Sequence, residues 1–298
     1  MQSRVLMLTG ATGFIGRRLV ADLGEPWQVV VAIRASSADQ GRRAARLDLA
    51  QPDSIVRAFN QVCPDAVVHT AAIAAPDECE RNPELARRIN VDAVETLARL
   101  CAEAKARLVH FSTDLVFDGQ KGRYREDDPV RPLSVYGHSK LASEQVALAL
   151  CPGAVVLRVA NCYGRPLGGR ASFVDELQAN LAAGRQVRGF TDQWRTSTFA
   201  DQLPAVVTRL LADPGLHGVF HWGGADRASR YEAALTFCRV MGYDERLIRP
   251  ASAADHPLLA RRPRDTTLDS SRLTQALRVS PLGLREGFTA LKGCWMQR

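Results

Sequence analysis

The sequence contains no uninterrupted apolar stretch that approaches the ~20 residues a membrane-spanning helix requires. Its first apolar run, Val5–Leu8, is too short for the hydrophobic region of a signal peptide, and no small-residue cleavage site follows it. We therefore expect a soluble, cytoplasmic protein that does not interact with a membrane.

Patterns typical of disulfide frameworks and metal sites are also missing. The seven cysteines are an odd number, and none belongs to a Cys-x-x-Cys pair or has histidines at ligand spacing. Such usage suits a reducing compartment. We expect no metal site and assign none of the cysteines a chemical role, because isolated cysteines are usually small buried apolar residues.

Lysine is scarce and basic clusters are absent, although the net charge is +7. Only four of the 39 basic residues are lysines, and the arginines stand singly or in pairs with no basic tail. This distribution argues against binding to nucleic acid, which requires clustered cations to neutralise phosphates. It remains compatible with a few arginines that face an acidic small molecule.

The chain is long enough, with 298 residues of which 46% are hydrophobic, to bury a large core. Short β-rich runs alternate with longer helical patterns in its first half, as in βαβ units with a parallel sheet. The expected strands are Val5–Thr9, Gln28–Ile33, Ala66–His69, Leu108–Ser112 and Val155–Val159. The expected helices between them are Phe14–Leu23, Pro52–Val62, Pro83–Ala104 and Ser134–Leu150. We predict an α/β fold with a Rossmann-type doubly wound parallel sheet and a smaller C-terminal substrate-binding lobe.

The composition changes after Asn161, where a Gly- and Arg-rich loop precedes helices expected near Phe173–Ala183 and Asp201–Leu211. We expect an NADP-binding Rossmann domain over residues 1–160 and a mainly substrate-binding lobe over residues 161–298. A late strand at Gly218–Trp222 is expected to return to the sheet.

A glycine-rich turn follows the first expected strand and opens the first expected helix. Its spacing is Gly-x-x-Gly-x-x-Gly, formed by Gly10, Gly13 and Gly16. Glycines there let the backbone approach a pyrophosphate, whose charge is favoured at a helix N-terminus. A plain turn is the alternative, but the strand-turn-helix context favours a dinucleotide site. The cofactor-binding residues predicted in this segment are Gly10, Thr12, Gly13, Phe14, Ile15 and Gly16.

The second expected strand is followed by Arg34, with Ser36 and Ser37 just beyond. An acid at this point would bind a ribose 2′-hydroxyl, whereas an arginine accommodates a 2′-phosphate. The sequence therefore favours NADP(H) over NAD(H). NAD(H) stays open, because Arg34 could be one more surface arginine in an arginine-rich chain.

The chemical signal lies in Tyr136-Gly137-His138-Ser139-Lys140, whose i,i+4 spacing places the phenol and the ammonium on one helix face. Carbonyl reduction requires a proton donor, and a nearby cation lowers the pKa of a phenol. His138 points elsewhere from this pair and is interpreted as a capping or surface residue. The strand ending at Ser112 and Thr113 places hydroxyls at the carboxyl edge of the sheet, where such folds bind ligands.

Three segments, together with the glycine turn, resemble the extended short-chain dehydrogenase/reductase family and its dTDP-4-dehydrorhamnose reductase branch. These segments are His110–Gly119, Pro132–Lys140 and Arg262–Leu273. The resemblance implies NADPH- or NADH-dependent reduction of the 4-keto group of a nucleotide-linked 6-deoxy sugar. It makes Tyr136 the acid, Lys140 its electrostatic partner and Thr113 the hydrogen-bond donor to the substrate carbonyl. Ser112 is a second candidate for that donor. Asn90 matches the asparagine of a family tetrad, with a solvated mid-helix asparagine as the alternative.

The resemblance also implies further contacts with the cofactor. Cofactor contacts are expected from Asp48, Leu49, Thr70, Ala71 and Ala72. Substrate contacts are expected from Asp114, Asn161, Arg165, Arg170 and Arg195. The three arginines would bind a diphosphate, or else are solvated loop charges. Leu115 stands where related dehydratases carry a glutamate, which argues against an elimination reaction.

Two other functions stay open. Gly218–Gly224 and Ser229–Glu232 are similar to the regulatory β subunit of methionine adenosyltransferase, which implies NADP binding without turnover. The third hypothesis is a reductase of a small keto metabolite without a nucleotide. The identity of the sugar, and whether the protein forms a homodimer, are not decided by the sequence.

Overall fold

A parallel seven-stranded sheet forms the centre of the computed structural model, which describes residues 4–34, 43–169, 171–255 and 259–295. The order of its strands is β3-β2-β1-β4-β5-β6-β9. The strands are β1 (Arg4–Thr9), β2 (Trp27–Ile33), β3 (Ala44–Arg46), β4 (Ala66–His69), β5 (Arg107–Thr113), β6 (Val155–Val159) and β9 (Gly218–Trp222). The order reverses direction at β1, which makes the carboxyl ends of β1 and β4 the expected place for a ligand.

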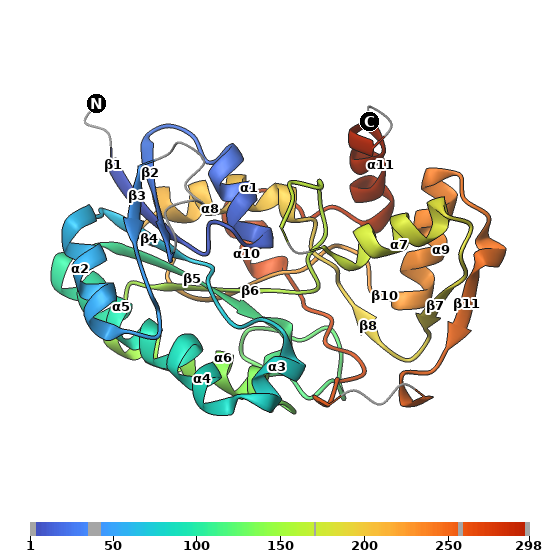
Figure 1. The fold of residues 1–298 in the computed structure, drawn as a ribbon, viewed down its shortest axis with the longest axis horizontal. Coiled ribbons are helices and arrows are strands. Elements are labelled where there is room, and N and C mark those ends of the chain that lie inside the picture. The colour runs from blue at the N-terminus through green and yellow to red at the C-terminus, as the bar shows by residue number, and fades with distance from the viewer. Residues whose placement is uncertain (1–3, 35–42, 170, 256–258, 296–298) are drawn as a thin grey trace.

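Helices cover both faces of this sheet (Figure 1). The helices are α1 (Phe14–Asp22), α2 (Pro52–Val62), α3 (Pro76–Arg81), α4 (Pro83–Arg87), α5 (Ala93–Ala104), α6 (Val135–Leu150), α7 (Phe173–Ala182), α8 (Leu203–Ala212), α9 (Arg230–Met241), α10 (Ser271–Leu277) and α11 (Leu284–Trp295). One core cluster joins the sheet to α1, α8 and α10, and a second joins it to α2, α5 and α6. The expected doubly wound α/β fold is therefore confirmed.

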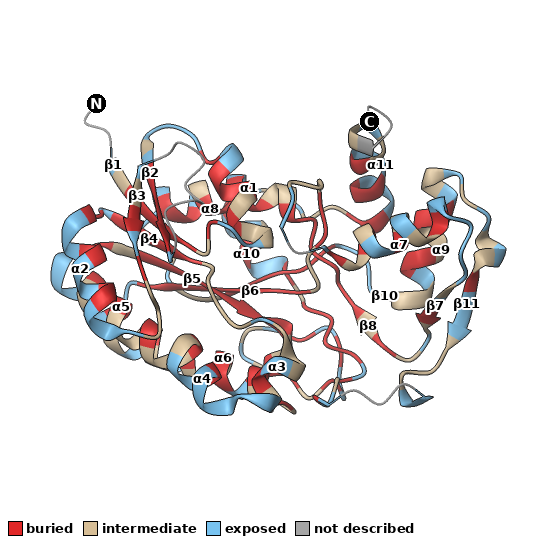
Figure 2. Ribbon diagram, in the orientation of Figure 1, coloured by how far each residue is buried: buried red, intermediate tan, exposed pale blue. Residues whose placement is uncertain are grey.

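Burial of both faces of the sheet explains why the sequences of the central strands are nearly continuous apolar runs. Strands β4 and β6 are buried at every position, and the helices turn exposed faces outward (Figure 2). Parallel sheets need cover on both faces because their crossover helices lie on both. Alternate residues of one strand accordingly enter different clusters, with Leu6 and Leu8 on one face and Met7 on the other.

A smaller lobe lies beyond the carboxyl ends of the strands (Figure 1). Its core joins α7, α9 and α11, and two small sheets complete it. These sheets pair β7 (Val187–Phe190) with β11 (Ile248–Ala251), and β8 (Trp194–Arg195) with β10 (Ala228–Ser229). Strand β9 belongs to the later half of the sequence, but it pairs in parallel with β6 at the edge of the main sheet.

One predicted helix is wrong in detail. The segment expected as a single helix over Pro83–Ala104 is divided into α4 and α5 by a π-helical turn at Arg88–Asp92. Apolar periodicity does not reveal such a turn, since one extra residue shifts the pattern only locally. Helix α6 begins one residue later than expected, because the Ser134 hydroxyl caps it by accepting from Gly137 N at 3.1 Å.

In the described part of the chain, no helix is both long and apolar enough to cross a membrane.

The tight packing of the glycine turn gives a test of the fold. Gly16→Ala should lower the free energy of unfolding by about 1–3 kcal/mol, because its Cβ would overlap the Gly10 carbonyl and the backbone must shift. Denaturant unfolding measures this difference. Gly153→Ala is the matched control, since nothing lies within 4 Å of a Cβ added there. Equal stability of the two variants would contradict the packing described here.

Candidate functional site

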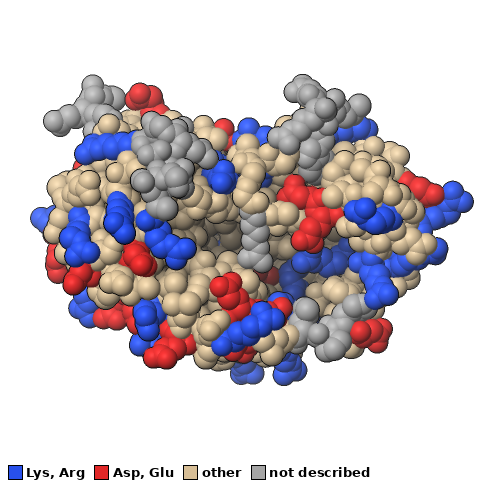
Figure 3. All heavy atoms as spheres, in the orientation of Figure 1, with Lys and Arg blue, Asp and Glu red and all other residues tan. Residues whose placement is uncertain are grey.

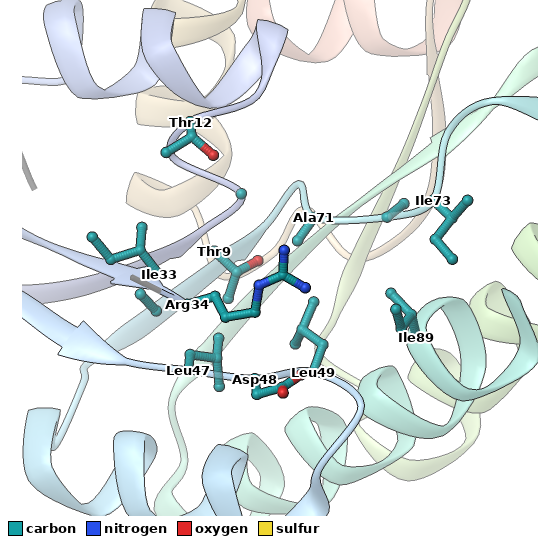
Figure 4. Close-up of a pocket in the computed structure, with 13 residues that line it drawn as sticks. Thr9, Thr12, Ile33, Arg34, Leu47, Asp48, Leu49, Ala71, Ile73 and Ile89 are labelled. Carbon is teal, nitrogen blue, oxygen red and sulfur yellow. The ribbon is translucent and has the colours of Figure 1, made fainter. Parts of the chain in front are cut away.

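A pocket of about 410 Å³ lies over the carboxyl ends of β1, β2 and β4 (Figure 4). It is lined by Thr9, Gly10, Thr12, Ala32, Ile33, Arg34, Leu47, Asp48, Leu49, Ala71, Ala72, Ile73 and Ile89. These residues come from the last positions of β1 and β2, from the segments that follow the strands, and, for Ile89, from the π-helical turn. The pocket therefore occupies the position at which open α/β sheets bind dinucleotides.

The glycine turn forms one wall of this pocket. Gly10 has φ +73°, and a Cβ there would lie 2.6 Å from Ala71 N. Gly13 is the N-cap residue of α1, and its N–H donates to the Gly10 carbonyl at 2.8 Å. The turn thus places Gly10 and Thr12 at the pocket, next to the N-terminus of α1, the kind of position that favours a pyrophosphate. Of the predicted residues of this turn, Gly10 and Thr12 line the pocket, and Gly13, Phe14, Ile15 and Gly16 do not. The guanidinium of Arg18 covers the Phe14 ring, 3.8 Å from its centroid.

Arg34 and Asp48 lie at the far side of the pocket. Arg34 is exposed, and its side chain extends into the pocket toward Ala71 (Figure 4). Asp48 is held by a hydrogen bond from its N–H to Ser54 Oγ at 3.0 Å. The structure therefore places a guanidinium that has no ion-pair partner among the described residues beside the pocket, while Ser36 and Ser37 lie outside those residues.

A second pocket, of about 500 Å³, adjoins the first at Ala72, which lines both. The main sheet and α6 contribute Ser112, Thr113, Asp114, Tyr136 and Lys140. The smaller lobe contributes Phe190, Gln193, Arg195, Arg230 and Arg262. Ile15, Thr70 and Asn161 also line it. The predicted chemical residues thus meet beside the predicted dinucleotide pocket.

Tyr136 lies in the first turn of α6 with its side chain almost fully buried in the second pocket. Burial raises the pKa of the phenol above its usual value, a hydrogen bond with Thr113 lowers it in part, and Asp114 raises it. The net shift is upward because burial outweighs the other effects, so the expected lowered pKa of the phenol is not found in this structure. The phenol stays protonated at neutral pH, as a proton donor must.

Lys140 lies one helical turn beyond Tyr136 and is 2% exposed. Its Nζ is 3.1 Å from His110 Nε2. Burial lowers the pKa of Lys140 to about 8, although the Glu144 carboxylate raises it. Tyr136, Lys140 and Glu144 follow one another at i,i+4 spacing, so all three lie on the helix face that packs on the sheet.

Ser112 lines the pocket, but its hydroxyl donates to Glu144 Oε1. Arg158 donates to the same carboxylate at 2.9 Å from Nε and 2.6 Å from Nη2. All three side chains are buried. Glu144 therefore fixes α6 against β5 through Ser112 and against β6 through Arg158. The Thr113 hydroxyl bonds Tyr136 and lies 3.2 Å from Asp114 Oδ1.

Asn90 is buried on the π-helical turn and does not line the second pocket. Its Oδ1 accepts from Ile73 N at 2.9 Å, and its Nδ2 donates to Ser139 Oγ at 3.0 Å. Asn90 therefore connects the loop after β4, which lines the dinucleotide pocket, to the helix that carries Lys140. The alternative of a solvated asparagine is wrong, and a positioning role is what the contacts allow. His138 is exposed, as expected.

Three arginines converge on the second pocket from the smaller lobe. Arg195 is already bonded: it pairs with Asp114 at 3.4 Å and donates to the carbonyls of Trp194, Pro263 and Arg264. Arg262 pairs with Asp77 at 3.3 Å. Arg230 stacks on Phe173 and forms no ion pair with any carboxylate of the described residues. Burial and the neighbouring Arg195 lower the pKa of Arg230 to about 10, so it remains charged.

Arg230 and Arg262 were missed as site residues by sequence reasoning. A signal for Arg230 exists, because it opens α9, where a cation is disfavoured by the helix dipole. In the space-filling view the molecule is hollowed near its centre, and Lys and Arg side chains gather beside the hollow over the smaller lobe (Figure 3). The pocket is therefore suited to a substrate with several negative charges.

Of the other predicted substrate residues, some line the second pocket and some do not. Asp114 and Asn161 line the pocket; Asp114 also accepts from Thr266, and Asn161 donates to Ser197 Oγ at 3.1 Å. Arg165 does not join them, since its guanidinium pairs with Asp201 and Asp22 instead. Arg170 lies outside the described residues. No cluster of His, Cys, Asp or Glu within the described ranges is arranged to hold a metal ion.

Two histidines lie buried beneath these pockets. His69 on β4 and His110 on β5 are partners in the strand register, with ring centroids 5.3 Å apart. Burial lowers the pKa of His69 to about 3 and that of His110 well below its usual value, and Lys140 lowers both. Both rings are therefore neutral at neutral pH.

Known proteins resemble this chain over nearly its whole length. The family model described as RmlD substrate binding domain matches residues 4–292. The probable low-salt glycan biosynthesis reductase Agl14 of Haloferax volcanii is 32% identical over 97% of each chain. Methionine adenosyltransferase 2 subunit beta of Bos taurus is 32% identical over 91% of this chain and 82% of its own. The crystal structure of a hypothetical dTDP-4-dehydrorhamnose reductase from Sulfolobus tokodaii is 30% identical, with a TM-score of 0.84 over 95% of this chain and 98% of that one.

The buried histidines predict how stability depends on pH. A histidine with a folded-state pKa near 3 binds a proton in the unfolded chain below about pH 6.5, so the free energy of unfolding should fall as pH drops from about 6.5 toward 3. His69→Asn should reduce the slope of that free energy against pH, between about pH 4 and 6, by up to about 1.4 kcal/mol per pH unit. Denaturant unfolding at several pH values measures the slope. His217→Asn, at an exposed position, is the control, and equal slopes for the two variants would contradict a neutral buried His69.

Proposed function

The chain belongs to the RmlD substrate binding domain family, and we propose that it is an NADPH-dependent reductase of the 4-keto group of a nucleotide-linked 6-deoxy sugar. One observation carries the proposal: the protonated phenol of Tyr136 lines a pocket that adjoins the dinucleotide pocket at Ala72. A proton donor and a hydride donor can therefore reach the same carbonyl group. On this proposal residues 1–160 mainly hold the cofactor and residues 161–298 mainly hold the substrate.

The dinucleotide pocket supports NADPH as the cofactor, with NADH as the alternative. The glycine turn offers its N–H groups to the pyrophosphate, and Arg34 offers a guanidinium to a ribose 2′-phosphate. When bound, the cofactor supplies a hydride to the carbonyl carbon. Lys140, at the base of the second pocket, is placed to hydrogen-bond the nicotinamide ribose.

The chain's own residues complete the reduction. Tyr136 gives its phenolic proton to the carbonyl oxygen as that oxygen gains negative charge, so that an alcohol forms. The Lys140 ammonium favours the resulting phenolate by its charge. Thr113, which hydrogen-bonds Tyr136, is placed to orient the same oxygen.

The arginines support a nucleotide diphosphate as the handle of the substrate. Guanidinium groups suit phosphate oxygens because their N–H groups form a planar fork. Arg230 has this fork free of any described carboxylate, whereas Arg195 is occupied by Asp114 and by backbone carbonyls. Arg230, with Arg262 beside it, is therefore the stronger candidate for the diphosphate.

A second function is supported by the identity to methionine adenosyltransferase 2 subunit beta. On that alternative the chain would bind NADP and a partner enzyme without turning over a carbonyl substrate. The two functions differ in one measurement, which is carbonyl-dependent oxidation of NADPH. Binding of NADPH without such oxidation, together with capture of a methionine adenosyltransferase catalytic subunit, would favour the alternative.

Tyr136→Phe tests the proposed proton donor. We expect kcat/KM to fall by about 10²- to 10⁴-fold, because the phenyl ring fills the same space but carries no proton to give. Oxidation of NADPH is followed by its nicotinamide absorbance against a panel of nucleotide-linked 4-keto-6-deoxy sugars. Tyr243→Phe is the matched control, because it removes a tyrosine hydroxyl that accepts a hydrogen bond from Gln178 in the smaller lobe. Full activity of the Tyr136 variant would remove the phenol from the reaction.

Arg230→Gln tests the diphosphate site. We expect KM for the nucleotide sugar to rise about 10- to 100-fold with the NADPH affinity unchanged, since a charge-assisted hydrogen bond is worth about 1.5–3 kcal/mol. The same variant should match the wild type on a sugar that lacks the diphosphate. Arg249→Gln, an exposed arginine of the same lobe, controls for the loss of charge. An equal effect on both sugars would show that Arg230 does not bind the diphosphate.

A further inference from the structure

The proposed reaction leaves one buried polar chain unexplained. Thr9 Oγ1 lies 2.7 Å from His69 Nδ1 under the dinucleotide pocket, and His110 Nε2 lies 3.1 Å from Lys140 Nζ under the substrate pocket. The two imidazoles stack between these ends with an interplanar angle of 22°. Buried polar groups that belong to no ion pair need a reason to be retained, because burial of a polar group is costly.

Lys140 depends on His110 for its hydrogen bond. The Glu144 carboxylate, one turn away, is already occupied by Ser112 and by the two-pronged contact of Arg158. Within the described residues, the contact with His110 Nε2 is the hydrogen bond that Lys140 Nζ makes. An ammonium that is 2% exposed has little water to replace this acceptor.

Ser143 links the tautomer of His110 to the hydrogen bond that Lys140 donates. Its hydroxyl donates to the Lys140 carbonyl at 2.7 Å, so toward His110 Nε2, 2.9 Å away, it can only accept. When Nε2 carries the imidazole proton, it donates to Ser143 and cannot accept from Lys140. When Nδ1 carries that proton, Nε2 is free to accept from the ammonium.

We propose that His110 is a positioning residue for Lys140, and that its neutral imidazole accepts a hydrogen bond through Nε2 and so keeps the buried side chain in its charged form. The proposal rests on the proposed function only in taking Lys140 as part of the reacting set. No net proton transfer is involved, because the ammonium keeps its proton while the imidazole carries its own on Nδ1, a buried atom with no hydrogen-bond partner among the described residues. His69 stacks on the same ring and closes that side of it against water.

The other charged groups around Lys140 do not substitute for this contact. They are Glu144 on its own helix and His69 on β4, with Tyr136 and Asp114 lining the same pocket and Arg158 paired with Glu144. Glu144 favours the ammonium through its charge, and Arg158 pairs with the same carboxylate. His69 and His110 are both neutral, since burial lowers their pKa values. Burial also lowers the pKa of Lys140 to about 8, so loss of one acceptor would reach the neutral pH range.

A matched pair of substitutions tests the proposal. His110→Met and His110→Gln have side chains of similar length and flexibility, but only the glutamine can accept a hydrogen bond from the ammonium. Lysine labelled with carbon-13 at Cε reports the titration of each side chain by NMR, and the chain has only four lysines, so Lys140→Arg identifies the signal. The measurement uses the protein without substrate.

We expect the Lys140 titration to move to lower pH by about one unit in His110→Met and to remain near that of the wild type in His110→Gln. Ser143→Ala should not lower it, because this change removes only the competing partner of Nε2. His110→Phe replaces the methionine variant if that variant does not fold. Equal titrations in the methionine and glutamine variants, or an equal fall in Ser143→Ala, would overturn the proposal.

The pH dependence of turnover separates this inference from the proposed function. If the nucleotide sugar is reduced, the alkaline limb of kcat/KM should move to lower pH in His110→Met, in step with the Lys140 titration, while the NADPH affinity is measured separately. A wild type that reduces no sugar would refute the proposed function, and the NMR titration would still decide the role of His110.

Discussion

The buried ion pair between Glu144 and Arg158 fixes the geometry on which the site depends. Its two N–H to carboxylate contacts join α6 to β6, and the Ser112 hydroxyl joins the same carboxylate to β5. Glu144 lies on the same helix face as Tyr136 and Lys140, so this contact sets how far the phenol and the ammonium project over the sheet. Two buried charges are tolerated there because each is paired and hydrogen-bonded.

The two pockets follow from the parallel sheet. The carboxyl ends of its strands meet at one edge, which brings the glycine turn, the loop after β4 and the hydroxyls after β5 together. The smaller lobe then closes the site with positive charge, since Arg195, Arg230 and Arg262 reach it from separate segments. The half with the sheet thus offers the Tyr136 phenol, the Thr113 hydroxyl and the Lys140 ammonium, and the smaller lobe offers three guanidinium groups. A substrate with a carbonyl at one end and a diphosphate at the other matches this division.

The sequence by itself determined the framework of the protein. Strand and helix periods, the glycine spacing and the Tyr136–Lys140 spacing are local features, because each depends on residues within about two helical turns. They were sufficient for the α/β fold, for the family resemblance and for the positions of Gly10, Arg34, Thr113 and Tyr136 at the pockets. The π-helical turn that carries Asn90 was not predicted from the sequence, because its single extra residue leaves the apolar pattern almost unchanged.

Only the tertiary structure decided the electrostatics. The pKa of Tyr136 rises rather than falls because burial is a property of the packed chain, and Lys140 finds its partner on β5, 30 positions away along the sequence. In the same way Arg165 is bound by Asp201 and Asp22, while Arg230 stacks on Phe173 at the pocket and pairs with no carboxylate of the described residues. Spacing along the chain reveals which groups share a helix face. It does not reveal which charges lose their water or which partners they meet, because both depend on segments that come together only on folding.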